Sequence, residues 1–122
     1  MHELSIALSI VEMAQEEAAC RGPLQVRAVH LRLGKLVGVV KQALLSSWEM
    51  ACQDTPLDGS QLLIEEIPVE VFCPSCQAPR LVAPLHWFAC PECGTPTPTV
   101  LRGKELEVVA LEITDLEAVD ER

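Results

Sequence analysis

The sequence contains no tyrosine, and it has only two tryptophans and two phenylalanines among 122 residues. Its core must therefore be built from aliphatic side chains, and with 49% hydrophobic residues the chain has enough of them. Basic residues are also scarce, since nine Lys and Arg stand against eighteen Asp and Glu, for a net charge of −9. Proteins that bind nucleic acids need clustered Lys and Arg, so the composition argues against that class of partner. The negative charge suits a basic protein partner or a metal cation, and it also favours solubility by itself.

The sequence also lacks a long apolar run. No segment approaches the roughly 20 residues that are needed to span a bilayer. The segment after Met1 carries Glu3, Glu12, Glu16 and Glu17, whereas a secretory signal peptide begins with basic residues. We therefore expect a cytoplasmic protein that begins at or beside Met1 and has no membrane span. Six cysteines in such a reducing compartment are poor candidates for disulfides, so their spacing must indicate what they do.

Hydrophobic periodicity predicts two helices. The first covers residues 4–20 and ends at Gly22 and Pro23; its expected buried face is Leu4, Leu8, Val11, Ala14 or Gln15, and Ala18. The second covers about 41–53 and offers for burial Ala43, Leu44, Trp48 and Cys52. Alternating apolar residues predict strands over 24–34, 62–71 and 104–114, with Pro68 at an edge or a bulge.

Four of the six cysteines form two matched motifs, "CPSC" (Cys73–Cys76) and "CPEC" (Cys90–Cys93). Each Cys-x-x-Cys turn brings two sulfurs onto one centre, and two such turns complete a tetrahedral four-sulfur shell that suits zinc or a single iron. Gly94 fits a turn that aims backbone N–H groups at sulfur, whereas Gln77 after the first pair predicts a less regular turn. A closed shell has no open coordination position, so we expect a structural zinc site.

The remaining cysteines and the order of elements complete the predicted architecture. Cys20 and Cys52 each stand at the end of a helix and are expected to pack in the interior, as free cysteines commonly do. The order of elements predicts an α+β fold with two helices on a small three-stranded mixed sheet and an inserted four-cysteine zinc-ribbon module. The main domain is predicted to comprise residues 1–71 and 103–122, and the zinc-binding module residues 72–102.

The start of the chain, "MHE", raises a separate possibility. A bulky second residue prevents removal of Met1, so the α-amine of Met1, the backbone nitrogen of His2 and its imidazole can chelate one metal ion. The amide of Glu3 can add a fourth nitrogen. Such a near-planar nitrogen set suits Ni(II) or Cu(II). An early histidine is common, however, so position alone is weak support.

Three stretches together carry a family resemblance. "MHELSIALSIVEMA" at the start, "LRLGKLVGV" after the first predicted strand and "IEEIPVEVFCPSC…FACPECG" near the end resemble the HypA/HybF family of hydrogenase nickel-incorporation proteins. The resemblance covers essentially the whole chain in the same order. It implies a small cytoplasmic metallochaperone, not an enzyme. A HypB-like GTPase and the large subunit of nickel–iron hydrogenase are the implied partners; weak self-association is left open.

The resemblance also implies a site for each of two metals. Nickel, as cargo, would be held at Met1 by its amine, at His2 by imidazole and amide, and at Glu3 by its amide, with the Glu3 carboxylate left open as a further ligand. Structural zinc would be held by Cys73, Cys76, Cys90 and Cys93. Some relatives have an acidic residue where this chain has Val40, so no carboxylate ligand is expected there.

Other interpretations remain open. A zinc-ribbon interaction module without nickel chemistry is one alternative, although a module that binds nucleic acid would have basic patches or exposed aromatic residues, which are scarce here. A rubredoxin-like electron carrier, which would hold iron in the same four thiolates, is another. No nucleophile and base are arranged for a hydrolase. His30 is expected to face solvent, and His86 is expected to have a hydrogen-bonding or surface role, although either could supplement a metal site.

Overall fold

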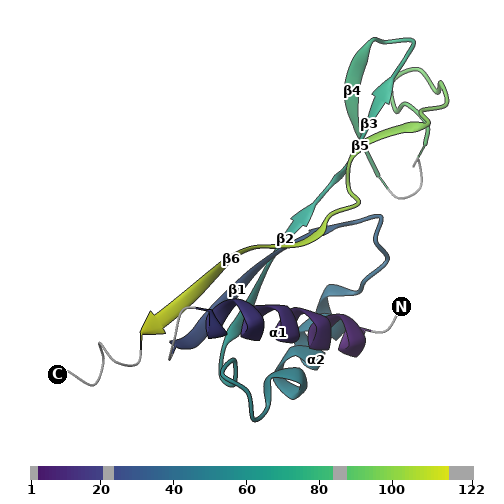
Figure 1. Cartoon of the computed structure of the whole chain (residues 1–122). Coiled ribbons are helices and arrows are strands. Elements are labelled where there is room, and N and C mark those ends of the chain that lie inside the picture. The colour runs from purple at the N-terminus through teal and green to yellow at the C-terminus, as the bar shows by residue number, and fades with distance from the viewer. Residues whose placement is uncertain (1–2, 21–23, 84–87, 116–122) are drawn as a thin grey trace. The chain divides into compact units, whose positions relative to one another are not determined.

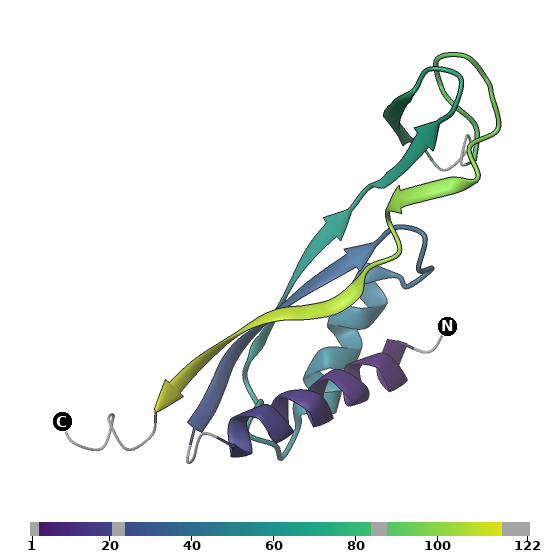
Figure 2. The same cartoon turned by 45° about the horizontal axis from the view of Figure 1, so that its top comes forward.

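A computed structural model of the chain describes residues 3–20, 24–83 and 88–115 (Figure 1). In chain order, its helices and strands are α1 (Glu3–Ala19), β1 (Leu24–Gly34), α2 (Lys41–Cys52), β2 (Gln61–Ile67), β3 (Val69–Cys73), β4 (Ala78–Val82), β5 (Thr99–Arg102) and β6 (Leu106–Asp115). They form two three-stranded sheets with the orders β2-β1-β6 and β4-β3-β5. In the first sheet the arrows of β1 and β2 point one way and that of β6 the other (Figure 2), so the predicted mixed sheet under two helices is confirmed.

The contacts of the chain group into two compact units. The first draws on residues 1–31, 39–64 and 108–122, and the second on residues 32–38 and 65–107. None of the described helices is long and apolar enough to cross a membrane.

The core of the first unit lies between the two helices and the sheet β2-β1-β6. Its centre is aliphatic, as the composition requires, with one aromatic ring from Trp48 in α2. Small side chains on α1 (Ala7, Ala14 and Ala18) are fully or almost fully buried, which lets the helix backbone approach its neighbours closely. The Trp48 indole N–H donates to the Ser60 hydroxyl oxygen at 3.2 Å, so its polar atom is satisfied at the edge of this core.

The buried face of α1 differs from the prediction. Val11, Ala14 and Ala18 are buried as expected, but Leu4 and Leu8 are exposed, and Ala7 and Ile10 occupy the interior instead. Both sets have helical spacing, so the sequence pattern alone does not select between them. The prediction that Cys20 is buried is also wrong: it follows the last turn of α1, two residues beyond buried Ala18, and is exposed.

Pro68 ends β2 and separates it from β3. The sequence predicts one strand over 62–71, whereas the structure has two strands that belong to different sheets. Proline cannot donate a ladder hydrogen bond, which is the physical reason for a break at this residue. Beyond it, β3 pairs antiparallel with β4, placing Cys73 opposite Ala78, and antiparallel with β5, placing Val71 opposite Val100.

Gly34 lies where β1 ends, and its backbone runs directly against another strand connection. The Gly34 N–H donates to the carbonyl oxygen of Glu105 at 2.7 Å, and the Leu36 N–H donates to that of Gly103 at 2.8 Å. A Cβ atom at Gly34 would lie only 2.1 Å from the carbonyl oxygen of Gly103. The close approach of two backbones therefore requires glycine in the "LGKLVGV" stretch.

We expect Gly34→Ala to lower the free energy of unfolding by about 2–4 kcal/mol, because the backbone must separate to admit a methyl group. Gly38→Ala is the matched control: Gly38 has φ of 84° but nothing within 4 Å of an added Cβ. Gly38→Ala should lower the free energy of unfolding by only about 1 kcal/mol, because alanine is disfavoured at positive φ but meets no neighbouring atom. Urea denaturation of both variants measures the difference, and equal losses would contradict the steric explanation.

Candidate metal centre

The four cysteines of the two Cys-x-x-Cys motifs meet in the second unit. Cys73 ends β3 and Cys76 follows in the turn to β4, while Cys90 and Cys93 lie in a second turn. That second turn is closed by the Cys90 N–H, which donates to the Thr95 carbonyl at 2.9 Å. All four sulfur atoms lie within 4.8 Å of one another. Two hairpin-like turns therefore face each other, as the spacing of the motifs predicts.

The sulfur separations fit a tetrahedral shell. Sγ of Cys93 lies 3.5 Å from that of Cys73 and 3.7 Å from that of Cys76, and Sγ of Cys76 lies 4.0 Å from that of Cys90. Zinc–sulfur bonds of about 2.3 Å in tetrahedral geometry give sulfur–sulfur edges of about 3.8 Å. A disulfide requires about 2.05 Å, so these are separate thiols arranged around a common centre.

Both turns have the same backbone geometry. The Gln77 N–H donates to the carbonyl of Cys73, and the Gly94 N–H donates to the carbonyl of Cys90, each at 2.8 Å. Gln77 and Gly94 have φ of 54° and 77°, in the left-handed region. The prediction that the first turn is less regular is therefore wrong. Gln77 tolerates the conformation while its side-chain amide donates to the Pro74 carbonyl at 2.5 Å.

Backbone and side-chain donors around the sulfurs favour thiolates. The Cys76 N–H donates to Sγ of Cys73 at 3.3 Å, and the Glu92 N–H donates to Sγ of Cys90 at 3.4 Å. The Thr95 hydroxyl lies 3.1 Å from Sγ of Cys93, and this hydrogen bond, with that of the Thr95 backbone, lowers the pKa of Cys93 to about 6. The contact with Thr95 therefore favours the thiolate form of Cys93.

The thiol of Cys76 has a raised pKa because it lies among the other three cysteines. A hydrogen bond with Arg80 of β4 lowers its pKa, but hydrogen bonds with Cys93 and Cys73 and the effect of burial outweigh it and raise the pKa to about 11. Crowded thiolates repel one another, and a divalent cation at their centre removes that repulsion. The donor set therefore fits zinc, which would be held by all four cysteines and would leave no position open for catalysis.

The sequence does not indicate the supporting groups of this cluster. Arg80 and Thr95 lie outside the two motifs, and neither was predicted to take part. Thr95 follows Cys93 by two residues, and its hydroxyl also lies 3.0 Å from that of Ser75, inside the first motif. A hydroxyl two residues after a predicted metal-binding cysteine is a usable signal, whereas nothing in the sequence distinguishes Arg80 from other surface arginines.

Of the predicted nickel site at the N-terminus, the structure describes only Glu3. Met1 and His2 lie outside the described residues, and Glu3 begins α1. The Glu3 carboxylate accepts a hydrogen bond from the backbone N–H of Val40 at 3.1 Å. Val40 is the N-cap of α2 and provides no side-chain cap itself, so Glu3 reaches from one helix to cap the next. The Val40 side chain is exposed and apolar, and it offers no ligand.

We expect Glu3→Ala to lower the free energy of unfolding by about 1–2 kcal/mol, because α2 loses its capping acceptor and a carboxylate that favours its N-terminal dipole. Glu3→Gln keeps an acceptor oxygen and should lose less. Glu12→Ala removes an exposed carboxylate from the same helix and serves as the matched control. Urea denaturation followed by tryptophan fluorescence gives the comparison, and equal stability of Glu3→Ala and Glu12→Ala would contradict the capping role.

His30 and Cys52 are not members of the four-cysteine cluster. His30 is half-buried on β1, and its Nε2 lies 2.6 Å from a carboxylate oxygen of Glu112 on β6, so it is paired rather than simply solvated. His86 lies outside the described residues. Cys52 is buried as predicted, and burial raises the pKa of its thiol. Within residues 3–20, 24–83 and 88–115, the four cysteines are the only group of three or more His, Cys, Asp or Glu side chains arranged to hold a metal ion.

Comparison with known proteins identifies the family. A family model described as hydrogenase/urease nickel incorporation, metallochaperone, hypA, matches residues 1–113. The chain is 50% identical over 112 residues to a hydrogenase maturation factor HypA of Chloroflexus aurantiacus, covering 92% of this chain and 98% of the relative. It is 46% identical over 115 residues to that of a Roseiflexus species, covering 94% of each.

Solved structures share the fold. The solution structure of the Ni metallochaperone HypA from Helicobacter pylori matches with a TM-score of 0.61 at 23% identity, covering 92% of this chain and 97% of that one. A second solution structure, of a HypA protein, matches with a TM-score of 0.65 at 22% identity, covering 94% and 98%. With the four-cysteine cluster in place and the family model matching from the first residue to residue 113, the chain belongs to the HypA family of nickel-incorporation metallochaperones for hydrogenase maturation.

Proposed function

We propose that this protein binds Ni(II) at its N-terminus and delivers it, together with a HypB-like GTPase, to the large subunit of nickel–iron hydrogenase. The nickel ligands are the amine of Met1, the imidazole and amide of His2, and the amide of Glu3. The observation that carries the proposal is the family match that begins at residue 1 and therefore includes the "MHE" stretch. The proposed place of action is the cytoplasm, where the resemblance puts this family.

The contact between Glu3 and Val40 supports nitrogen coordination at the terminus. One oxygen of the Glu3 carboxylate accepts the Val40 N–H at 3.1 Å, which holds this side chain at the start of α2. We assign the Glu3 side chain to this contact between the helices and the Glu3 backbone amide to the nickel ion.

The four cysteines are proposed to hold zinc as a structural ion. Zinc would supply the positive charge that lets the four thiolates share one centre, and it would fix the two turns of the second unit. Its shell is closed, so no chemistry on a substrate is assigned to it, and we propose that the protein is not an enzyme. The nickel-binding domain then comprises residues 1–71 and 103–122, and the zinc-binding module residues 72–102.

The delivery step is tested in a cell that makes a nickel–iron hydrogenase but lacks its own HypA protein. Expression of this chain should restore nickel in the purified large subunit, and His2→Ala should not restore it although it accumulates to the same level. Nickel restored equally by both proteins would contradict delivery through the terminal site. Neither protein restoring nickel to the large subunit, while the purified chain still binds nickel, would contradict delivery to that hydrogenase. Such a result would leave the proposed nickel binding intact.

A further inference from the structure

Strand β6 has one edge with no partner among the described strands. The sheet order is β2-β1-β6, so β6 pairs with β1 on one side only. It is ten residues long, against seven for β2 at the other edge, and its sequence "LEVVALEITD" contains no proline, lysine or glycine. Proline and lysine are residues by which proteins commonly prevent pairing at an edge. The N–H and C=O groups along this edge are therefore suited to accept another strand.

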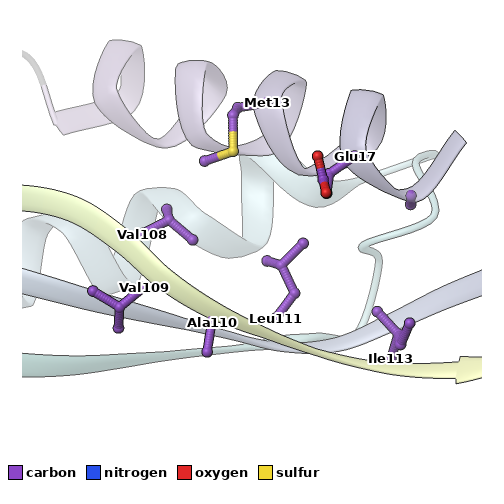
Figure 3. A pocket seen from close by; sticks show the side chains of 8 residues that line it. Met13, Glu17, Val108, Val109, Ala110, Leu111 and Ile113 are labelled. Carbon is purple, nitrogen blue, oxygen red and sulfur yellow. The ribbon is translucent and has the colours of Figure 1, made fainter. Parts of the chain in front are cut away.

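An apolar groove runs beside this edge, between α1 and β6. Figure 3 shows Met13 and Glu17 on the helix above the strand residues, with Val108 and Leu111 pointing towards the helix. The groove has a volume of about 410 Å³. Met13, Val109 and Ile113 are 42%, 52% and 39% exposed, so they form a cluster of large apolar side chains in contact with water. Such clusters on a small protein commonly mark a site of protein association.

The charge around the groove has one sign. The elements α1 and β6 contain no Lys, Arg or His, and their acidic residues with described side chains include Glu12, Glu16 and Glu17 in α1 and Glu107 and Glu112 in β6. On the strand, Glu107 and Glu112 are paired with Arg32 and His30 of β1. The helix therefore contributes much of the acidic rim, through exposed residues that include Glu12 and Glu16.

The acidic residues indicate which kind of segment can bind at the β6 edge and the groove. A second copy of the chain would bring the same acidic elements against this face, and like charges placed opposite one another in paired strands are destabilising. A segment that carries Lys or Arg gains attraction instead, and its association is accelerated by the opposite charge.

We propose that the free edge of β6 and the α1–β6 groove bind an extended segment of a partner protein in which apolar residues alternate with Lys or Arg. The segment adds to the sheet as a fourth strand. Its apolar side chains then enter the groove beside Met13 and Ile113, and its basic side chains point to the opposite face of the sheet, where Glu112 lies beside His30. The acidic residues of α1 add long-range attraction for the basic segment. None of the residues that line the groove belongs to the proposed nickel site or to the four-cysteine cluster.

The probe is a synthetic ten-residue peptide that alternates Val and Lys, the same length as β6. At low salt and millimolar peptide, β6 amides of the full chain should become protected from hydrogen exchange while β2 amides remain unchanged. Protection should decline as salt rises, and a peptide with Glu in place of Lys should give none. Absence of protection with the Lys peptide at low salt, or protection at β2 instead, would overturn the proposal.

Two matched comparisons separate strand addition from loose electrostatic attraction. Val109→Lys should weaken peptide binding by about tenfold or more, because it places charge in the apolar contact. Leu63→Lys makes the same change at an exposed position of β2 and should have no effect. Two further peptides are methylated on alternate backbone nitrogens, in opposite registers, and only one should lose binding. Equal binding of both, or equal weakening by the two Lys variants, would overturn strand addition.

Discussion

Replacing His2 with Ala should weaken nickel binding by more than about a hundredfold, beyond what loss of an outer-shell partner usually costs. The substitution removes the imidazole, and two chelate rings cannot both close without it. Zinc content and the free energy of unfolding should stay at their wild-type values, because the proposed site is separate from the four-cysteine cluster and from the core. Calorimetric titration with Ni(II), alongside metal analysis of the same sample, measures both effects.

The matched control is His30→Gln, which removes an imidazole elsewhere in the same unit. His30 lies 2.6 Å from Glu112 across the sheet, and glutamine can still donate to that carboxylate. Nickel affinity should therefore be unchanged in this variant. A large loss in His30→Gln together with wild-type affinity in His2→Ala would place the nickel site at His30 and contradict the terminal site.

Replacing any one of Cys73, Cys76, Cys90 and Cys93 with Ser should release zinc and unfold the second unit. The buried aliphatic side chains of its three-stranded sheet are few, and they include Val69 and Val71. Small modules of this kind depend on their metal, and zinc binding in zinc-finger peptides supplies about 10–16 kcal/mol. The wild-type protein should contain about one zinc ion per chain. Metal analysis and hydrogen exchange of β3, β4 and β5 amides measure the result.

Cys20→Ser is the control for thiol loss, because Cys20 is exposed and lies outside the cluster. It should retain zinc and native hydrogen exchange. Stoichiometric iron in the wild-type protein, visible through iron–thiolate absorption, would contradict the zinc assignment and favour the electron-carrier interpretation. Metal-free protein with protected β3, β4 and β5 amides would contradict a structural role for any metal.

The helices were predictable because their apolar residues recur at helical spacing over several turns. The observed α1 and α2 differ from the predicted ranges by no more than one residue at either end. The choice of buried face was not predictable for α1. Leu4 and Leu8 compete with Ala7 and Ile10 for the interior, and the packing of the small Ala7 against the neighbouring elements decides it.

The second sheet was not predictable from local patterns. Strand β5 has four residues, and β4 includes Pro79 and Arg80, so neither shows a sustained alternation of apolar and polar residues. Their pairing with β3 depends on contacts between residues that are distant in sequence, such as Phe72 with Thr99. The four cysteines, in contrast, were identified by spacing alone, because each Cys-x-x-Cys motif defines a local turn.

Nickel titration of two forms of the wild-type chain determines whether the free terminus holds the metal. One form begins at Met1, and the other carries a short peptide extension before Met1 that turns the α-amine into an amide. Coordination by the terminal amine predicts tight binding in the first form above the histidine pKa of about 6.5, with loss as pH falls below it, because imidazole protonates. It predicts at least tenfold weaker binding in the extended form although His2 is present. Equal nickel affinity of the two forms would show that the α-amine of Met1 is not a ligand.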